Sequence, residues 1–185
     1  MPYRRRYRRR YTLARSLKAT KYSNETYGSL AVIQNLNAAA GSHAFMNIPI
    51  IPNAIQGVLG TRKVKNITLR ILAEETLYDD QGGNPITERG RIAFALVYVP
   101  EGTQPSNMDF GANANVASLY EPNQNVIMSG IVDSNQTYSF KTRLSRNLNA
   151  GDQVALILFD LTYAANNGDS ITTPVQFTCN YAIAF

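Results

Sequence analysis

Strict alternation of apolar and polar residues in the last segment of the chain is the feature that most constrains its fold. From Val175 to Phe185, every second residue is Val, Phe, Cys, Tyr or Ile, with Gln, Thr, Asn and Ala between them. A period of two places alternate side chains on opposite faces of an extended strand, whereas an amphipathic helix repeats every 3.6 residues. Shorter alternating stretches occupy 66–73 and 138–144. The pattern predicts sheets that bury one face.

Two further segments, 92–99 and 154–159, are apolar at nearly every position. Strands that are apolar on both faces belong in the middle of a sandwich or at a contact between subunits. Strand-like composition also occurs at 26–35, 44–50 and 125–132. The chain is therefore expected to contain at least eight strands.

The connections between these strands indicate how they are arranged. Turn residues cluster at 79–85, 100–107 and 164–170, and the stretch 101–124 has no regular period, which is typical of a functional or contact-forming loop. Helical patterning is confined to 11–21. Eight strands with long connections predict an all-β fold, an eight-stranded antiparallel jelly-roll sandwich. An immunoglobulin-like sandwich fits less well, because the chain has one Cys and no Trp.

Charge divides the chain into two parts. Residues 1–24 carry nine positive side chains and no acid, and the first acid is Glu25. The remaining nine positive and 13 negative side chains leave residues 25–185 at −4, within a whole-chain charge of +5. This division predicts a basic arm over 1–24 that binds a polyanion, and a folded domain over 25–185 with another role.

The arm has the chemistry of a binder of single-stranded nucleic acid. Arginine presents a planar fork of donors that matches phosphate oxygens, and interleaved tyrosines can stack on unpaired bases of any sequence. A solvated tail that serves only as a nuclear-import signal is the alternative, and the two roles are compatible. The predicted binding residues are Tyr3, Arg4, Arg5, Arg6, Tyr7, Arg8, Arg9, Arg10, Tyr11, Arg15, Lys18 and Lys21.

A second positive set is found on the folded domain: Arg62, Lys63, Lys65 and Arg70 flank or line one expected strand, and Lys141, Arg143 and Arg146 another. Lys141 and Arg143 lie two residues apart and so share one face of the strand expected at 138–144. They could extend the nucleic-acid surface, or they could be an ordinary solvated strand face.

The residue types that catalysis and metal binding need are scarce. His43 is the only histidine and Cys179 the only cysteine, so neither a nucleophile–histidine site nor a tetrahedral zinc site is expected. The acidic turn at Asp79–Asp80 is expected to be solvated rather than a cation site. No catalytic residue, metal or cofactor is predicted. The chain also lacks a secretory leader and any apolar run long enough for a membrane span, so no membrane insertion is expected.

Several stretches resemble a known family. The arm MPYRRRYRRR precedes segments at 60–71, 95–107, 119–133 and 142–159 that resemble strand and loop phrases of capsid proteins from small circular single-stranded DNA viruses, the circovirus-like group. The resemblance implies a T=1 icosahedral shell of sixty self-assembling copies whose arms point inward onto the genome. It also implies a place in the virion, entry into the host nucleus during assembly, and import receptors as partners.

The sequence thus favours a capsid subunit that packages single-stranded DNA. Two rivals stay open. The first is a satellite-type capsid that encloses single-stranded RNA, since the arm contacts phosphate and both nucleic acids have it. The second is a cellular nucleic-acid-binding protein, which the acidic domain disfavours because such proteins usually spread basic charge over the folded surface. An enzyme is the least favoured class.

The arm is expected to bind by electrostatics without reading sequence. For a peptide of residues 1–21, log K against log salt should have a slope of about −4 to −6, at about −0.7 per phosphate neutralised. Replacing Tyr3, Tyr7 and Tyr11 with Ala should cost about 1–3 kcal/mol per stacked tyrosine and leave the slope unchanged. Anisotropy titrations with two unrelated oligonucleotides measure both quantities. A flat salt response, or a strong preference for one sequence, would contradict this mode of binding.

Overall fold

The computed structural model describes residues 21–52, 60–80, 83, 85–103 and 125–184, and these residues form eleven strands and no helix. Every pairing between the strands is antiparallel. Eight longer strands build the sandwich: β1 (Ser23–Ala38), β2 (His43–Ile51), β3 (Arg62–Ala73), β6 (Arg91–Val99), β7 (Val126–Asp133), β8 (Gln136–Thr142), β10 (Gln153–Tyr163) and β11 (Asp169–Ala184).

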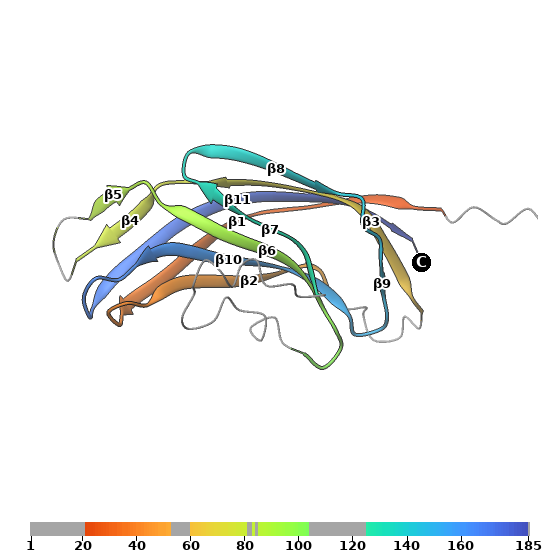
Figure 1. The fold of residues 1–185 in the computed structure, drawn as a ribbon, viewed down its shortest axis with the longest axis horizontal. Coiled ribbons are helices and arrows are strands. Elements are labelled where there is room, and N and C mark those ends of the chain that lie inside the picture. The colour runs from red at the N-terminus through yellow and green to blue at the C-terminus, as the bar shows by residue number, and fades with distance from the viewer. Residues whose placement is uncertain (1–20, 53–59, 81–82, 84, 104–124, 185) are drawn as a thin grey trace, which may run out of the picture.

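The eight longer strands pair in a nested order. The first pairs with the last, β1 with β11, and the pairs β2 with β10, β3 with β8, and β6 with β7 follow inward along the chain. This is one long antiparallel hairpin rolled into two sheets. Sheet A has the order β1-β11-β3-β8, and sheet B has the order β2-β10-β6-β7 (Figure 1). Such an arrangement is a jelly roll, so the predicted fold class is confirmed.

Three short strands were not predicted. β4 (Thr76–Asp79) continues the path of β3 along β11, and β5 (Ile86–Glu88) pairs with β4. β9 (Arg146–Leu148) continues the path of β8 along β3. Strands of three or four residues are too short for a period of two to stand out in the sequence. The helical pattern at 11–21 and the loop at 101–124 fall almost wholly outside the described residues.

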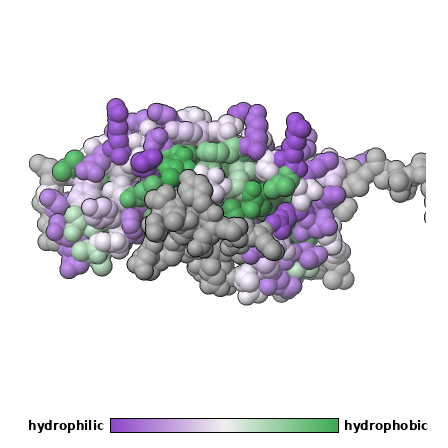
Figure 2. Space-filling model, in the orientation of Figure 1, coloured by the Kyte–Doolittle hydropathy of each residue, from purple (hydrophilic) through white to green (hydrophobic). Residues whose placement is uncertain are grey.

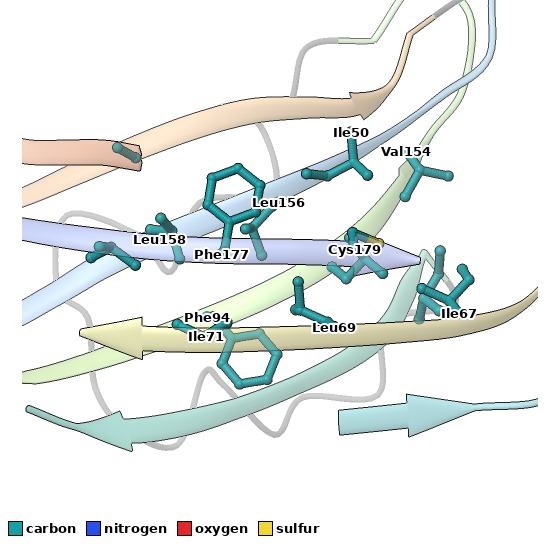
Figure 3. Close-up of a cluster of buried hydrophobic side chains, with 14 of the residues drawn as sticks. Ile50, Ile67, Leu69, Ile71, Phe94, Val154, Leu156, Leu158, Phe177 and Cys179 are labelled. Carbon is teal, nitrogen blue, oxygen red and sulfur yellow. The ribbon is translucent and has the colours of Figure 1, made fainter. Parts of the chain in front are cut away.

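The inward faces of the two sheets form the core. Figure 3 shows side chains from sheet A, among them Leu69, Ile71 and Phe177, packed against Leu156 and Leu158 of sheet B, all buried. This is the face that the alternation in 66–73 and 175–185 predicts to be apolar.

An aromatic pair joins the two sheets inside the core. The ring of Phe94 on β6 lies 4.5 Å from that of Phe140 on β8, measured between centroids, at an interplanar angle of 54°. Gly130 on β7 leaves room for this pair, because a Cβ at that position would lie 2.9 Å from the Phe94 ring. The packing therefore depends on a missing side chain as much as on the two rings.

The two segments that are apolar on both faces are β6 and β10, the central strands of sheet B. Their outward side chains, including Ala95, Val97 and Ile157, form a second buried apolar cluster on the far side of that sheet. The expected place in the middle of the sandwich is confirmed. The outward face of sheet A is polar instead.

Replacing Phe94 with Ala should lower the free energy of unfolding by about 3–5 kcal/mol, because the side chain is fully buried and the cavity would span both sheets. Leu144→Ala, at a side chain that is 58% exposed, is the matched control and should change it by less than about 0.5 kcal/mol. Urea unfolding followed by circular dichroism measures both values. Equal effects would mean that the aromatic pair does not hold the sheets together.

Candidate nucleic-acid interface on sheet A

Three cations stand on the outward face of β3. Inward residues of this strand, such as Val64 and Leu69, are buried in the core. Lys63 and Lys65 lie on either side of the buried Val64, and Arg70 lies between two buried residues further along the strand. A β-bulge around Asn66, whose φ is 54°, inserts one extra residue and shifts the alternation, so all three cations point away from the core on the surface of sheet A.

The neighbouring strand adds two more cations. Lys141 on β8 lies opposite Thr68, and Arg70 lies opposite Ser139, so Arg70 and Lys141 are diagonal neighbours about 7–8 Å apart along the backbone. Arg143 is exposed and lies one residue beyond the end of β8, so the strand expected over 138–144 ends two residues earlier than predicted. Lys63, Lys65, Arg70, Lys141 and Arg143 are called the basic face below. Figure 2 shows hydrophilic side chains projecting along the upper edge of the molecule, which β8 and β3 form in Figure 1.

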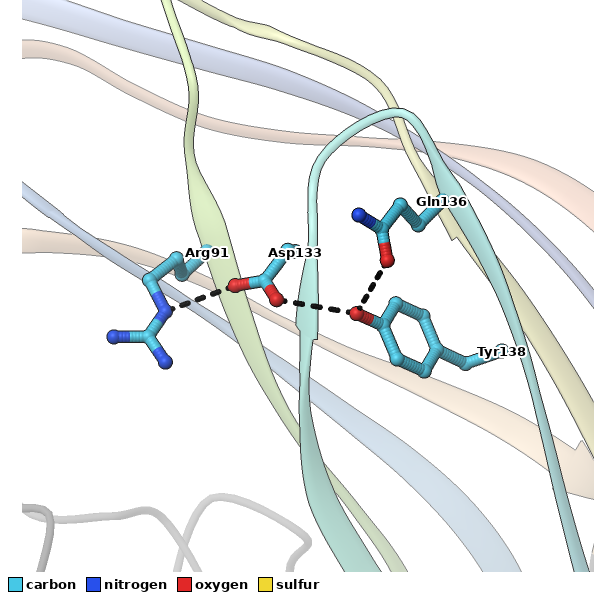
Figure 4. A network of polar contacts seen from close by, with 4 residues as sticks. All are labelled: Arg91, Asp133, Gln136 and Tyr138. Carbon is cyan, nitrogen blue, oxygen red and sulfur yellow. Dashed lines mark hydrogen bonds and ion pairs between the residues drawn. The ribbon is translucent and has the colours of Figure 1, made fainter.

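No ion pair to the basic face is found among the described residues. An ion pair elsewhere joins Arg91 to Asp133, with Nε 3.0 Å from Oδ1. It lies at the turn between β7 and β8, where Asp133 also meets the Tyr138 hydroxyl, and that hydroxyl lies 2.9 Å from Gln136 (Figure 4). Unpaired cations gathered on one face create a positive potential that attracts a polyanion.

The arm joins the domain at the basic face. The ammonium of Lys65 lies 3.6 Å from the centroid of the Tyr22 ring, a cation–π contact. Tyr22 directly precedes β1, whose first residue, Ser23, pairs with Ile183, and Ile183 pairs in turn with Val64 of β3. The last residues of the arm thus lie across the sheet beside the cations of β3. Sequence reasoning did not find this contact, because residues 22 and 65 come together only through the strand between them.

The start of β3 is held from inside the sandwich. Arg62 is the one cation of this strand that points inward, and it is buried. Its guanidinium donates to the carbonyl oxygens of Pro52 at 2.9 Å and Asp152 at 3.0 Å. These bonds fix the strand end from which Lys63 and Lys65 project.

The Asp152 carboxylate completes this anchor. It accepts hydrogen bonds from the Tyr98 hydroxyl at 2.7 Å, the Asn149 amide at 2.7 Å and the Glu101 amide at 3.0 Å. Burial alone would raise the pKa of Asp152. The three hydrogen bonds and the nearby Arg62 charge outweigh that effect and leave the pKa below its usual value.

Only three of the predicted binding residues lie among the described ones. Lys21, Lys141 and Arg143 are all exposed, as a role in binding requires. The other arm residues, from Tyr3 to Lys18, lie outside the described residues, so their role stays a prediction. Lys63, Lys65 and Arg70, which the sequence also places along one strand, complete the surface. Alternation alone would have put Arg70 on the opposite face from the two lysines, because the bulge in β3 leaves no signal in the residue pattern.

The single histidine and cysteine have structural surroundings. His43 Nδ1 lies 3.0 Å from the Asp160 carbonyl oxygen and 3.1 Å from that of Thr162, and the ring packs against Phe159. Cys179 is buried in the core, and burial raises its thiol pKa to about 12. Neither geometry resembles an activated nucleophile. Within the described ranges, no group of three or more possible metal ligands occurs and no helix could span a membrane.

Comparisons with known proteins identify similar folds but no family. No protein-family model and no curated protein matches the chain. Among solved structures, one of Mud crab tombus-like virus has a TM-score of 0.46 at 8% identity, covering 91% of this chain and 84% of the other. One of Macrobrachium rosenbergii nodavirus has a TM-score of 0.38 at 10% identity, over 94% and 90%. The Penaeus stylirostris densovirus capsid has a TM-score of 0.37 at 6% identity, over 89% and 84%.

Asp152→Asn should destabilise the protein by about 1–3 kcal/mol at pH 7, because an amide group would face the hydrogen-bond donors of Tyr98 and Asn149. A carboxyl whose pKa is lowered by folding stabilises the native state above its unfolded pKa, and this stabilisation is lost as pH falls through the folded pKa. The difference from wild type should therefore shrink below about pH 4. Thermal melts between pH 3 and 7 measure it, with the exposed Glu88→Gln as control. A difference that does not change with pH would contradict this role of Asp152.

Proposed function

We propose that the protein is a viral capsid subunit that assembles into a closed shell and packages a single-stranded nucleic acid. One observation carries the proposal: the arm meets the folded domain beside an unpaired basic face, at the contact between Tyr22 and Lys65. The described end of the arm therefore joins the domain on the side of the jelly roll that carries the basic face. The far side of the molecule, formed by sheet B, lacks such a surface in its described strands.

The mechanism has no catalytic step. Arginines of the arm, residues 1–24, pair with phosphates and release condensed counterions, while Tyr3, Tyr7 and Tyr11 stack on unpaired bases. Lys141 and Arg143, with the other cations of the basic face, hold the strand against the domain. Because these contacts go to phosphates and to the faces of bases, packaging does not depend on sequence.

Shell formation would use the apolar side chains that the isolated subunit leaves exposed. Leu36 on β1, Phe45 on β2 and Tyr163 on β10 are each at least half exposed. Burying such residues between copies removes apolar surface from water, the usual driving force of assembly. We propose a T=1 shell of sixty copies. Its arms would supply roughly 540 positive charges, enough to neutralise part of a genome of a kilobase or more.

Single-stranded DNA is the proposed cargo, on the resemblance of the arm and several segments to circovirus-like capsid proteins. Packaging of such a genome would take place in the host nucleus, where the basic arm would also engage import receptors. A single-stranded RNA genome is the second candidate, because phosphate contacts serve both.

Removing the arm should separate packaging from folding. Deletion of residues 2–21 should leave the sandwich folded and reduce the nucleic acid in purified particles severalfold, because nine of the 18 cations are lost. Lys141→Gln with Arg143→Gln should cause a smaller loss. Arg89→Gln, at an exposed cation that is not part of the basic face, is the matched control and should cause none.

Electron microscopy, the ratio of absorbance at 260 and 280 nm, and nuclease typing of the extracted strand are the measurements. Protein that stays monomeric in ultracentrifugation across salt and pH would contradict the shell. Truncated particles with an unchanged nucleic-acid content would contradict the role of the arm. If the particles yield only RNA, single-stranded DNA is ruled out as the cargo in favour of single-stranded RNA.

A further inference from the structure

A shallow groove of about 400 Å³ crosses the outward face of sheet A beside the basic face. Strands β1, β3, β8 and β11 all contribute to it. Its principal lining residues are Gly28, Leu30, Arg70, Leu72, Gln176 and Thr178.

The groove is open because one strand position lacks a side chain. Gly28 lies in the interior of β1, opposite Thr178, and its φ is not in the left-handed region. A Cβ built there would come no closer than 3.4 Å to the Phe177 carbonyl oxygen and the Thr178 hydroxyl, an ordinary contact. The fold therefore does not need glycine here, although glycine weakens a strand. Such a glycine is typical of a place where a ligand approaches the backbone closely.

The walls of the groove combine three kinds of group. Leu30 is 61% exposed and, with the partly buried Leu72, supplies apolar surface. Arg70 supplies a planar guanidinium without an ion pair. Thr178 supplies a hydroxyl, and Gln176 keeps its amide oxygen as an acceptor while its nitrogen donates to Glu74 at 3.2 Å. No acid lines the groove.

We propose that this groove holds one unpaired base of the packaged strand. The base would lie over Gly28 against the leucines, with the Arg70 guanidinium beside it and the side chains of Gln176 and Thr178 at its edge. Stacking on apolar and guanidinium surfaces is how proteins hold unpaired bases, and it tolerates any sequence. The adjoining phosphates would reach Lys141, the diagonal neighbour of Arg70. This inference rests on the proposed function and adds a base site on the folded domain to the phosphate contacts.

The test compares oligonucleotides with and without bases. Full-length wild-type protein, stripped of nucleic acid, is titrated with a fluorescent oligothymidylate, an oligouridylate and an abasic chain of the same length. Gly28→Val fills the groove with a residue that strands favour. Gln34→Val places the same residue on the same face of the same strand, outside the groove, and is the matched control.

Gly28→Val should weaken binding of the oligothymidylate on the order of fivefold and leave binding of the abasic chain unchanged, whereas Gln34→Val should behave as wild type. The oligouridylate should show a loss of similar size with Gly28→Val, because stacking tolerates either strand. If wild type, Gly28→Val and Gln34→Val bind each oligonucleotide equally well, the base site is overturned and the proposed function is unaffected. The proposed function fails instead if deleting residues 2–21 does not weaken binding of the abasic chain. If Gly28→Val impairs particle assembly but leaves oligonucleotide binding unchanged, the base site is also overturned, and the groove is then a contact between copies.

Discussion

Packing between the inward faces of the two sheets is the constraint on which the rest of the structure depends. Because Leu69, Ile71 and Phe177 must lie against Leu156 and Leu158, the register of each strand is set by which of its faces is apolar. A slip of one residue in β3 would bury lysines and expose isoleucines. The packing of the core therefore determines which charged side chains lie on the outward face of sheet A, and the basic face results from that packing.

The two sheets differ in what they leave outside. Sheet B buries apolar side chains on both faces of its central strands, while sheet A carries cations, hydroxyls and a groove. The arm meets sheet A, at Tyr22 and Lys65, rather than sheet B. In the proposed capsid subunit, this asymmetry would turn sheet A toward the polyanion and leave other surfaces for neighbouring copies.

Much of the sandwich could be predicted because its signals are local. Alternation located the strands that became β3, β8 and β11, and continuous apolar runs located β6 and β10, because burial on one face or two leaves a direct trace in the residue pattern. The short strands β4, β5 and β9 left no such trace, since each follows a neighbouring strand for only three or four residues. Of the candidate site, Lys141 lies on the outward face of β8, whereas Arg143, predicted to share that strand face, comes after the strand has ended at Thr142.

The sequence by itself determined the fold class, the separation of a basic arm from a mildly acidic domain, and the apolar face of strands such as β11, because all three follow from residues near one another in the chain. The tertiary structure alone decided which strands became neighbours. That pairing brings Lys141 of β8 beside Arg70 of β3, places Tyr22 under Lys65, and sets Gly28 of β1 across β11 from Arg70. Contacts between residues far apart in the chain depend on the order of strands in a sheet, and in a single sequence no local pattern records that order.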